Sequence, residues 1–470
     1  MNALAWSAAD RTVQQALQLI IGIWLARILS PSDFGLMGII MLFAGISYVF
    51  VEGGFGQAVA RIKGADNRYF TSIWIMNLAI ASLLYIILYL SAPYISIFFG
   101  QPQLKAIIRI LFLALFFNAG YLIQHTQLGI QLDYRSIAFC NITATFISGI
   151  CGITIAYVYK NVWALVAQQV TYHFFRLCCF SLVTKWLPSR HISLQPIRQL
   201  GRFSINLMGT SLLNALFSNL FVTFIGKFYP ISYTGYYSQA QKQNDTIQFT
   251  FISILNGVSY NIFALLHENT TRLKNFYTQL LHKSALLTLP VFCVLITLSE
   301  PFFSVLLGEK WISSVPYFQL LCGAQLLCVC DLLCINLLNA RGKSRITFRI
   351  ELIKKTGMLA TLFVFASYGI YQGIIAYGIL NWGIGFTWLY LAKKELSLSW
   401  NVLWKSVIPA LGIGIIVSCL IWNIGWILNT HIYIELLIQL SIGIACYCLL
   451  LHKVYPGLIK DIKQLIPKDN

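Results

Sequence analysis

The chain has 470 residues, of which 58% are hydrophobic and only 10% are charged. Its mean hydropathy is +0.73, whereas soluble domains carry about 25% charged residues. These values exclude a soluble globular protein and indicate an integral membrane protein. The net charge of +18 would suggest a nucleic-acid partner in a soluble chain. Here the basic residues lie between apolar runs, so membrane topology explains them and no nucleic-acid partner is expected.

A helix that crosses a bilayer needs about 20 mostly apolar residues. In chain order the candidate segments are 12–29, 35–57, 70–92, 106–126, 137–158, 161–183, 203–226, 245–266, 284–307, 315–339, 352–370, 372–392, 405–427 and 432–451. The longest connections lie near 184–202, 227–244 and 267–283. We therefore predict an all-α, polytopic membrane protein with about 14 transmembrane helices.

The basic residues orient these predicted helices, because cytoplasmic loops carry an excess of Lys and Arg. With the N-terminus in the cytoplasm, 26 of the 33 basic residues fall on the cytoplasmic side and the other 7 on the opposite side. An even number of helices then places both termini in the cytoplasm. We therefore expect a multi-pass membrane protein.

The first connection, Ser30-Pro31-Ser32-Asp33, contains a helix start signal. Ser30 can cap the second helix, Pro31 suits its first turn, and Asp33 places a negative charge near the positive end of the helix dipole. We predict a tight helix–turn–helix here. Arg27 lies about one turn before it, and we favour a structural role in which its side chain reaches the membrane interface over a substrate contact.

Three short sequence matches between the two halves of the chain predict an internal repeat. Ala26 to Gly35 aligns with Gly226 to Gly235 at an offset of 200, and Glu52-Gly53 aligns with Asn256-Gly257 at 204. Pro93 to Gly100 aligns with Pro301 to Gly308 at 208. Each copy would hold six helices, related by an axis along the membrane normal. The predicted division is 1–200 (helices 1–6), 201–395 (helices 7–12) and 396–470 (helices 13 and 14 with a cytoplasmic tail).

Polar residues recur along one face of the first helix in each copy. Residues three or four apart share a helix face. The members of the first row are Arg11, Gln14 and Gln18, and those of the second are Asn206, Thr210, Asn214 and Ser218. Such rows line cavities in transporters, although polar residues also form hydrogen bonds between packed helices. We predict that both rows line a shared cavity that binds substrate.

Ionisable residues inside membrane helices are functional candidates, because burying a charge there is costly. Glu52, Gln169, His173 and Arg176 complete the predicted substrate-binding set. Glu52 and Asp331 are candidates for ion coupling; for Asp331, a buried ion pair between helices is an equally good interpretation. The chain lacks a GxxxxGK[ST] loop and an HExxH motif, so we expect no catalytic residues, no metal and no cofactor.

Several motifs resemble one known family. They are LARILSPSDFGLMGI (25–39), NVWALV (161–166), GKFYPISYTGYYSQA (226–240), LLGEKW (306–311) and NARGKSR (339–345). Together they resemble the polysaccharide-exporter branch of the multidrug/oligosaccharidyl-lipid/polysaccharide flippase superfamily, especially lipopolysaccharide, O-antigen and colanic-acid translocases. EGGFGQA (52–58) is also similar to the lipid II flippases, but Ile21-Gly22 stands where those carry an arginine–aspartate pair, which argues against lipid II as substrate.

This resemblance implies two six-helix lobes in a V around a central cavity. It also implies a non-enzymatic flippase of the bacterial cytoplasmic (inner) membrane, which moves an undecaprenyl-pyrophosphate-linked oligosaccharide from the inner to the outer leaflet. The expected partners are the lipid-linked oligosaccharide, membrane lipids, Na⁺ or H⁺ as a coupling ion, and a polymerase or other glycan-assembly proteins. The alternatives are a cation-coupled drug antiporter of the related extrusion family and a membrane polysaccharide polymerase.

Overall fold

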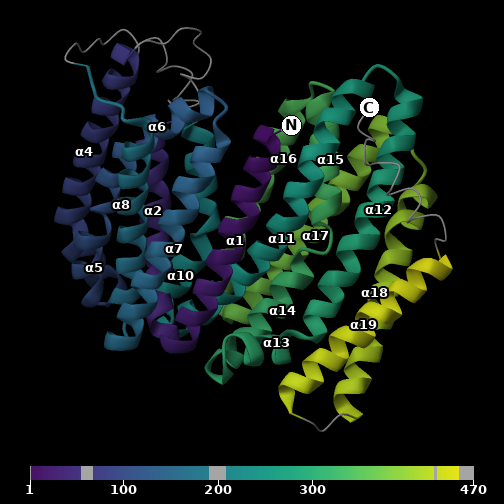
Figure 1. The fold of residues 1–470 in the computed structure, drawn as a ribbon. Coiled ribbons are helices and arrows are strands. Elements are labelled where there is room, and N and C mark those ends of the chain that lie inside the picture. Colours follow the sequence, from purple (N-terminus) through teal and green to yellow (C-terminus); the bar gives the residue numbers. More distant parts are fainter. Residues whose placement is uncertain (1, 54–66, 190–207, 428–430, 455–470) are drawn as a thin grey trace. The chain divides into compact units, whose positions relative to one another are not determined.

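The computed structural model describes residues 2–53, 67–189, 208–427 and 431–454. Every regular element in these ranges is a helix (Figure 1). The chain divides into two compact units, Met1–Ser238 and Gln239–Asn470. This boundary differs from the predicted one at residue 200, and the predicted three-part division stays a prediction.

The first unit contains eight complete described helices: α1 (Asn2–Ile28), α2 (Pro31–Glu52), α4 (Asn67–Phe99), α5 (Gln103–Leu111), α6 (Ala114–Ile130), α7 (Tyr134–Tyr159), α8 (Trp163–Thr184) and α10 (Leu220–Phe228). Helix α11 (Ile231–Leu266) begins in the first unit and continues without a break into the second.

The rest of the second unit is formed by α12 (Thr270–Thr297), α13 (Ser299–Leu306), the 3₁₀ turn η1 (Glu309–Ser314), α14 (Val315–Ala324), α15 (Cys328–Ala340), α16 (Ser344–Tyr368), α17 (Ile370–Leu396), α18 (Trp400–Ile427) and α19 (Ile432–Val454). All twelve cysteines of the chain are unpaired.

Among the described residues, ten helical segments are long and apolar enough to span a membrane, and a bent pair would make an eleventh. This confirms a polytopic helical membrane protein, while the number fourteen stays a prediction. Three other long helices, α1, α8 and α16, are not among those segments. Each of the three carries polar or charged side chains, which lower its mean hydropathy.

Two predicted connections are wrong. Residues 231–244 belong to α11, and α12 already begins at Thr270. These stretches are rich in Gln and Lys, which favour helix almost as strongly as Leu. Because these stretches are polar, they were predicted as connections, although both helices continue through them. The limits of an apolar run are therefore not the limits of the helix.

The predicted turn between α1 and α2 is confirmed. Ser30 is the N-cap of α2, Pro31 is its first residue, and the Asp33 carboxylate accepts from the Ser30 backbone N–H at 2.9 Å. The Ser30 hydroxyl oxygen accepts in return from the Asp33 N–H at 3.3 Å. This reciprocal capping box satisfies two donors at the helix start.

The corresponding turn of the second copy packs against the first. A Cβ on Gly35 would overlap the carbonyl oxygen of Ile231, and a Cβ on Gly235 would overlap that of Pro31. Ile231 and Pro31 are themselves 200 residues apart. The contact is therefore nearly symmetric: each glycine faces the residue equivalent to the one that its counterpart faces, as at a two-fold interface.

Four residues with positive φ in the first copy have counterparts in the second. The pairs are Gly100 and Gly308, Leu132 and Gly342, Lys160 and Gly369, and Lys185 and Ser397, at offsets of 208, 210, 209 and 212. Leu132 and Gly342 occupy the same turn, the Schellman motif that ends a helix. Its two hydrogen bonds, from the N–H of Asp133 to Leu128 O (3.0 Å) and of Leu132 to Gly129 O (3.2 Å), recur 210 residues later at 2.8 and 3.0 Å.

The fourth predicted span of the first copy, and the tenth of the chain, are both broken. Helices α5 and α6 are separated at Phe112–Leu113, and the Tyr85 hydroxyl donates to the free carbonyl of Arg109 at 3.1 Å. Helices α14 and α15 are separated at 325–327, where the Trp382 indole N–H donates to Gly323 O at 2.9 Å. A side-chain donor thus satisfies the Arg109 carbonyl at the first break, and at the second it supplements a long backbone hydrogen bond of 3.4 Å from the Leu326 N–H to Gly323 O.

Candidate functional site

Arg176 on α8 lies among aromatic side chains in the first unit. Its Nη1 donates to the Tyr121 hydroxyl at 2.8 Å, and its guanidinium carbon lies 4.4 Å from the centre of the Tyr121 ring. The rings of Tyr172 and Phe180 lie at 5.4 and 5.7 Å. The Nε is buried and has no hydrogen-bond partner. Arg176 is therefore held by a phenol and by π faces, and it retains an unused donor suited to an anion.

His173, one turn before Arg176, joins three helices. Its Nε2 lies 3.0 Å from the Tyr48 hydroxyl on α2, and its Nδ1 lies 3.4 Å from the Tyr121 hydroxyl on α6. Glu52 ends α2 one turn after Tyr48, is exposed, and interacts electrostatically with Arg176. The structure thus gathers Glu52, His173 and Arg176 in one region. Gln169, the remaining predicted residue of α8, is half-buried one turn before His173.

Asp10 on α1 is a site residue that the sequence reasoning missed. Its carboxylate accepts from the Gln14 amide at 2.7 Å and from the Asn141 amide of α7 at 3.1 Å. Gln14 therefore already has a hydrogen-bond partner, whereas Arg11 and Gln18, the other members of its predicted row, are exposed. The signal was available, because Asp10 lies four residues before Gln14 and so shares its helix face.

The second predicted polar row is interrupted. Asn206 lies outside the described residues, while Thr210, Asn214 and Ser218 lie on the segment Met208–Ser218. This segment meets α10 at an angle of 41°. At the bend, the Ser218 hydroxyl and the Asn219 amide both donate to the Ala215 carbonyl, at 3.2 and 3.1 Å. Side chains that compete for backbone groups in this way commonly bend helices.

Asp331 on α15 forms an ion pair in the second unit. Its Oδ2 lies 3.7 Å from Lys354 Nζ of α16, and its Oδ1 is buried without a hydrogen-bond partner. The geometry agrees with the ion-pair interpretation, and a role in ion coupling stays a prediction.

Asp331 precedes the left-handed Gly342 by eleven residues (342 − 331), as Tyr121 precedes Leu132 (132 − 121). The two copies therefore carry a phenol and a carboxylate at equivalent positions, each beside a cation.

Lys242 also escaped the sequence reasoning, which placed it in a loop on the non-cytoplasmic side. It lies on α11, eleven residues after the helix begins, and its side chain is exposed. At 1.5 Å per residue this is about 17 Å along the axis, roughly half the thickness of the hydrocarbon core. Extending the predicted helix back through the polar stretch 239–248 would have placed Lys242 within a membrane helix.

The described residues contain no group of three His, Cys, Asp or Glu side chains that could hold a metal ion. Polar clusters between the helices of a polytopic membrane protein are typical of membrane transporters. The fold is similar to that of the lipid II flippase MurJ in an inward closed conformation, with a TM-score of 0.75 over 97% of this chain and 100% of that chain, at 15% identity.

Two curated relatives are named for polysaccharide biosynthesis, one of them as a transport protein. The succinoglycan biosynthesis transport protein ExoT of Rhizobium meliloti is 24% identical over 85% of this chain and 79% of its own length. The teichuronic acid biosynthesis protein TuaB of Bacillus subtilis is 24% identical over 97% and 96%. A family model described as "Polysaccharide biosynthesis protein" matches residues 24–316, and the chain belongs to this family. It is a transport protein of polysaccharide biosynthesis and not an enzyme.

Proposed function

We propose that the chain flips an undecaprenyl-pyrophosphate-linked oligosaccharide, such as an O-antigen, capsule or exopolysaccharide repeat unit, across the inner membrane by alternating access. A sugar and a diphosphate cannot cross hydrocarbon unaided, whereas the lipid tail need not leave it. The relatives named for succinoglycan and teichuronic acid support a glycan substrate.

Arg176 is the observation that carries this proposal. A cation whose donors are not taken by a carboxylate can bind an anion without first losing a partner, and Arg176 meets a phenol. A guanidinium can bind two phosphate oxygens at once through parallel N–H groups. By contrast, Lys354 in the second unit is already paired with Asp331. We assign Arg176 to the diphosphate, with Arg11, Gln14, Gln18, Gln169, His173, Asn206, Thr210, Asn214 and Ser218 as further substrate-binding residues.

The proposal includes fourteen membrane helices, both termini in the cytoplasm, and two lobes, 1–200 and 201–395, followed by 396–470. The recurrence of left-handed residues at offsets of 208 to 212 supports two equivalent copies. Moving an anion outward is favourable by about 2.3 kcal/mol per charge per 100 mV when the inside is negative. Coupling to Na⁺ or H⁺ through Glu52 or Asp331 would add to this, and a polymerase would receive the flipped unit.

Export assays with arginine variants test the proposal. We expect Arg176→Ala and Arg11→Ala to abolish surface glycan in the native host while membrane abundance stays near normal. Arg176→Lys should restore little, because an ammonium cannot replace the planar guanidinium. Arg27→Ala is the matched control: it should lower abundance, and Arg27→Lys should rescue it. Normal export by the Arg176 and Arg11 variants would overturn the site.

A transport assay distinguishes the alternatives. The purified protein in liposomes should translocate a fluorescent undecaprenyl-pyrophosphate oligosaccharide and should not exchange cationic dyes for ions. Dye exchange without lipid translocation would instead identify a cation-coupled drug antiporter. Sugar-chain extension by the purified protein would identify a polymerase.

A further inference from the structure

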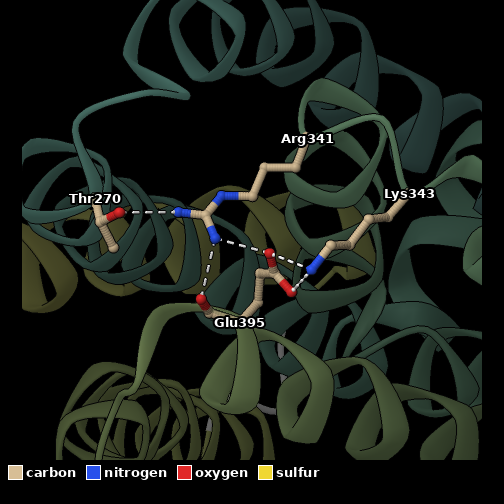
Figure 2. Close-up of polar contacts among 4 residues, drawn as sticks. All are labelled: Thr270, Arg341, Lys343 and Glu395. Carbon is tan, nitrogen blue, oxygen red and sulfur yellow. Dashed lines mark hydrogen bonds and ion pairs between the residues drawn. The ribbon is translucent and has the colours of Figure 1, made fainter.

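Four polar residues meet at one end of the second unit, where α12 begins and α15 and α17 end (Figure 2). Lys343 Nζ lies 2.8 and 2.7 Å from the two carboxylate oxygens of Glu395. Arg341 Nη1 lies 2.7 Å from Glu395 Oε1, and its Nη2 lies 3.5 Å from the Thr270 hydroxyl. An ammonium and a guanidinium thus hold one carboxylate between them.

This cluster is not required to form the turn that carries it. The equivalent turn of the first unit has Gln131 and Asp133 at the positions of Arg341 and Lys343, with the same backbone hydrogen bonds. Lys185 and Ser397, which follow α8 and α17, are paired at an offset of 212. The same offset places Val183 opposite Glu395. The backbone therefore adopts this conformation without any ion pair.

Lys343 is also unfavourable for the helix that follows it. In the first unit the Asp133 carboxylate caps α7, accepting from the Ser136 N–H at 3.1 Å and from its hydroxyl at 2.7 Å. These two hydrogen bonds from Ser136 hold the pKa of Asp133 below its usual value. Lys343 has no acceptor, and α16 begins without a side-chain cap. The second unit therefore lacks a side-chain cap, which would contribute about 1 kcal/mol, and has a cation at this position.

Two properties of the cluster suit an incoming anion. The Lys343 side chain is 46% exposed, so the cluster is open on one side, whereas that of Glu395 is only 11% exposed. The Nε of Arg341 is buried and has no hydrogen-bond partner, so the guanidinium has a donor to spare. A phosphate group can take the place of a carboxylate between Arg and Lys, and a diphosphate brings more charge and more acceptor oxygens.

We propose that Arg341 and Lys343 form a binding site for the diphosphate group of the lipid carrier, and that Glu395 occupies this site until the carrier arrives. The proposal rests on the proposed function, since it takes the carrier diphosphate as the ligand. In the proposed topology this end of the second unit faces the cytoplasm, where the loaded carrier is made.

Pyrophosphate binding to the purified full-length protein tests this site. The protein is placed in nanodiscs of phosphatidylcholine, and inorganic pyrophosphate is titrated by calorimetry. We expect Lys343→Gln to weaken binding by about tenfold or more, as for the loss of a charged hydrogen bond. Glu395→Gln should strengthen binding by a similar factor, because the competing carboxylate is gone. Lys394→Gln, next to Glu395 and exposed, is the matched control and should bind as the wild type does.

Further measurements keep the outcome decisive. Arg341 also donates to the Glu395 backbone carbonyl at 3.2 Å, so its loss can destabilise the end of α17, and Lys343→Gln and Glu395→Gln therefore carry the test. Unchanged pyrophosphate affinity in both would overturn the proposal and leave a structural ion pair.

Nanodiscs doped with undecaprenyl pyrophosphate should block pyrophosphate binding, and nanodiscs doped with phosphatidylglycerol should not. Equal blocking by phosphatidylglycerol would overturn the assignment to the carrier. This assay measures binding alone, so loss of export in the Arg176 variants stays a separate test of the proposed function.

Discussion

Gly35 and Gly235 meet backbone to backbone: a Cβ on Gly35 would lie 3.1 Å from the nitrogen of Gly235, and a Cβ on Gly235 would lie 3.2 Å from that of Gly35. The two residues are the last of the two segments that align at an offset of 200. Neither position has room for a side chain, and the obstacle on each side is backbone, which cannot rotate away. The closeness of this contact therefore depends on both residues being glycine.

We expect Gly35→Ala and Gly235→Ala each to destabilise the protein by about 2 kcal/mol or more, because the new methyl group forces the two helices apart. The melting temperature of the purified protein and its abundance in the membrane would measure this. Gly129→Ala in α6 is the control, since a Cβ there meets nothing within 4 Å. If Gly235→Ala is as stable as Gly129→Ala, the two helices are not in close contact.

Tyr121→Phe should lower export about tenfold at normal abundance. The change keeps the ring that faces Arg176 but removes the hydroxyl that bonds Arg176 and His173. Loss of a hydrogen bond to a charged group costs about 1.5–3 kcal/mol. Tyr172→Phe is the control, since the ring of Tyr172 also lies near Arg176, at 5.4 Å. Equal export by both variants would show that the Tyr121 hydroxyl does not position Arg176.

Asp10 and Asn141 should behave as one unit in a double-mutant cycle. Asp10→Leu removes the acceptor that joins α1 to α7, and Asn141→Leu removes its donor on α7. We expect each single change to destabilise the protein by about 1–3 kcal/mol and the double change to cost little more, because paired residues are not additive. Thermal unfolding of the four proteins would measure this coupling. Fully additive effects would contradict the contact.

Reporter fusions test the proposed topology. Fusions after Lys453 and within 184–202 should both read cytoplasmic, since 26 of the 33 basic residues lie on that side in the proposed arrangement. An alkaline phosphatase and a fluorescent protein, fused in turn at each site, give opposite signals on the two sides of the membrane. A periplasmic reading at either site would reject fourteen helices with both termini inside.

The predictions from sequence succeeded where the signal is local. The Ser30 and Asp33 capping box, the polytopic helical class and the family all follow from adjacent residues or short motifs. The gathering of His173 and Arg176 on α8 follows from helix periodicity. Their partners do not, because Tyr48 and Tyr121 lie 125 and 52 residues from His173 in sequence. An ordinary tyrosine in an apolar helix gives no sign that its hydroxyl meets a cation.

The remaining misses have a different cause. The limits of apolar runs were used as the limits of helices, so Asp10 and Lys242 were placed outside them. A helix is held by its own backbone hydrogen bonds and continues through polar residues wherever water or protein can solvate them. Asp10 and Lys242 both lie in such polar parts of their helices.

The paired left-handed residues differ in how well they retain backbone conformation and residue identity. Only Gly100 and Gly308 keep the same residue, whereas Leu132, Lys160 and Lys185 stand opposite Gly342, Gly369 and Ser397. A residue other than glycine tolerates this conformation at a cost of about 1–2 kcal/mol, which the surrounding helices can offset. In the proposed repeat, the sign of φ is thus retained at paired positions where the residue itself differs. A comparison of backbone dihedral angles therefore detects the proposed repeat at positions where a comparison of residue identities does not.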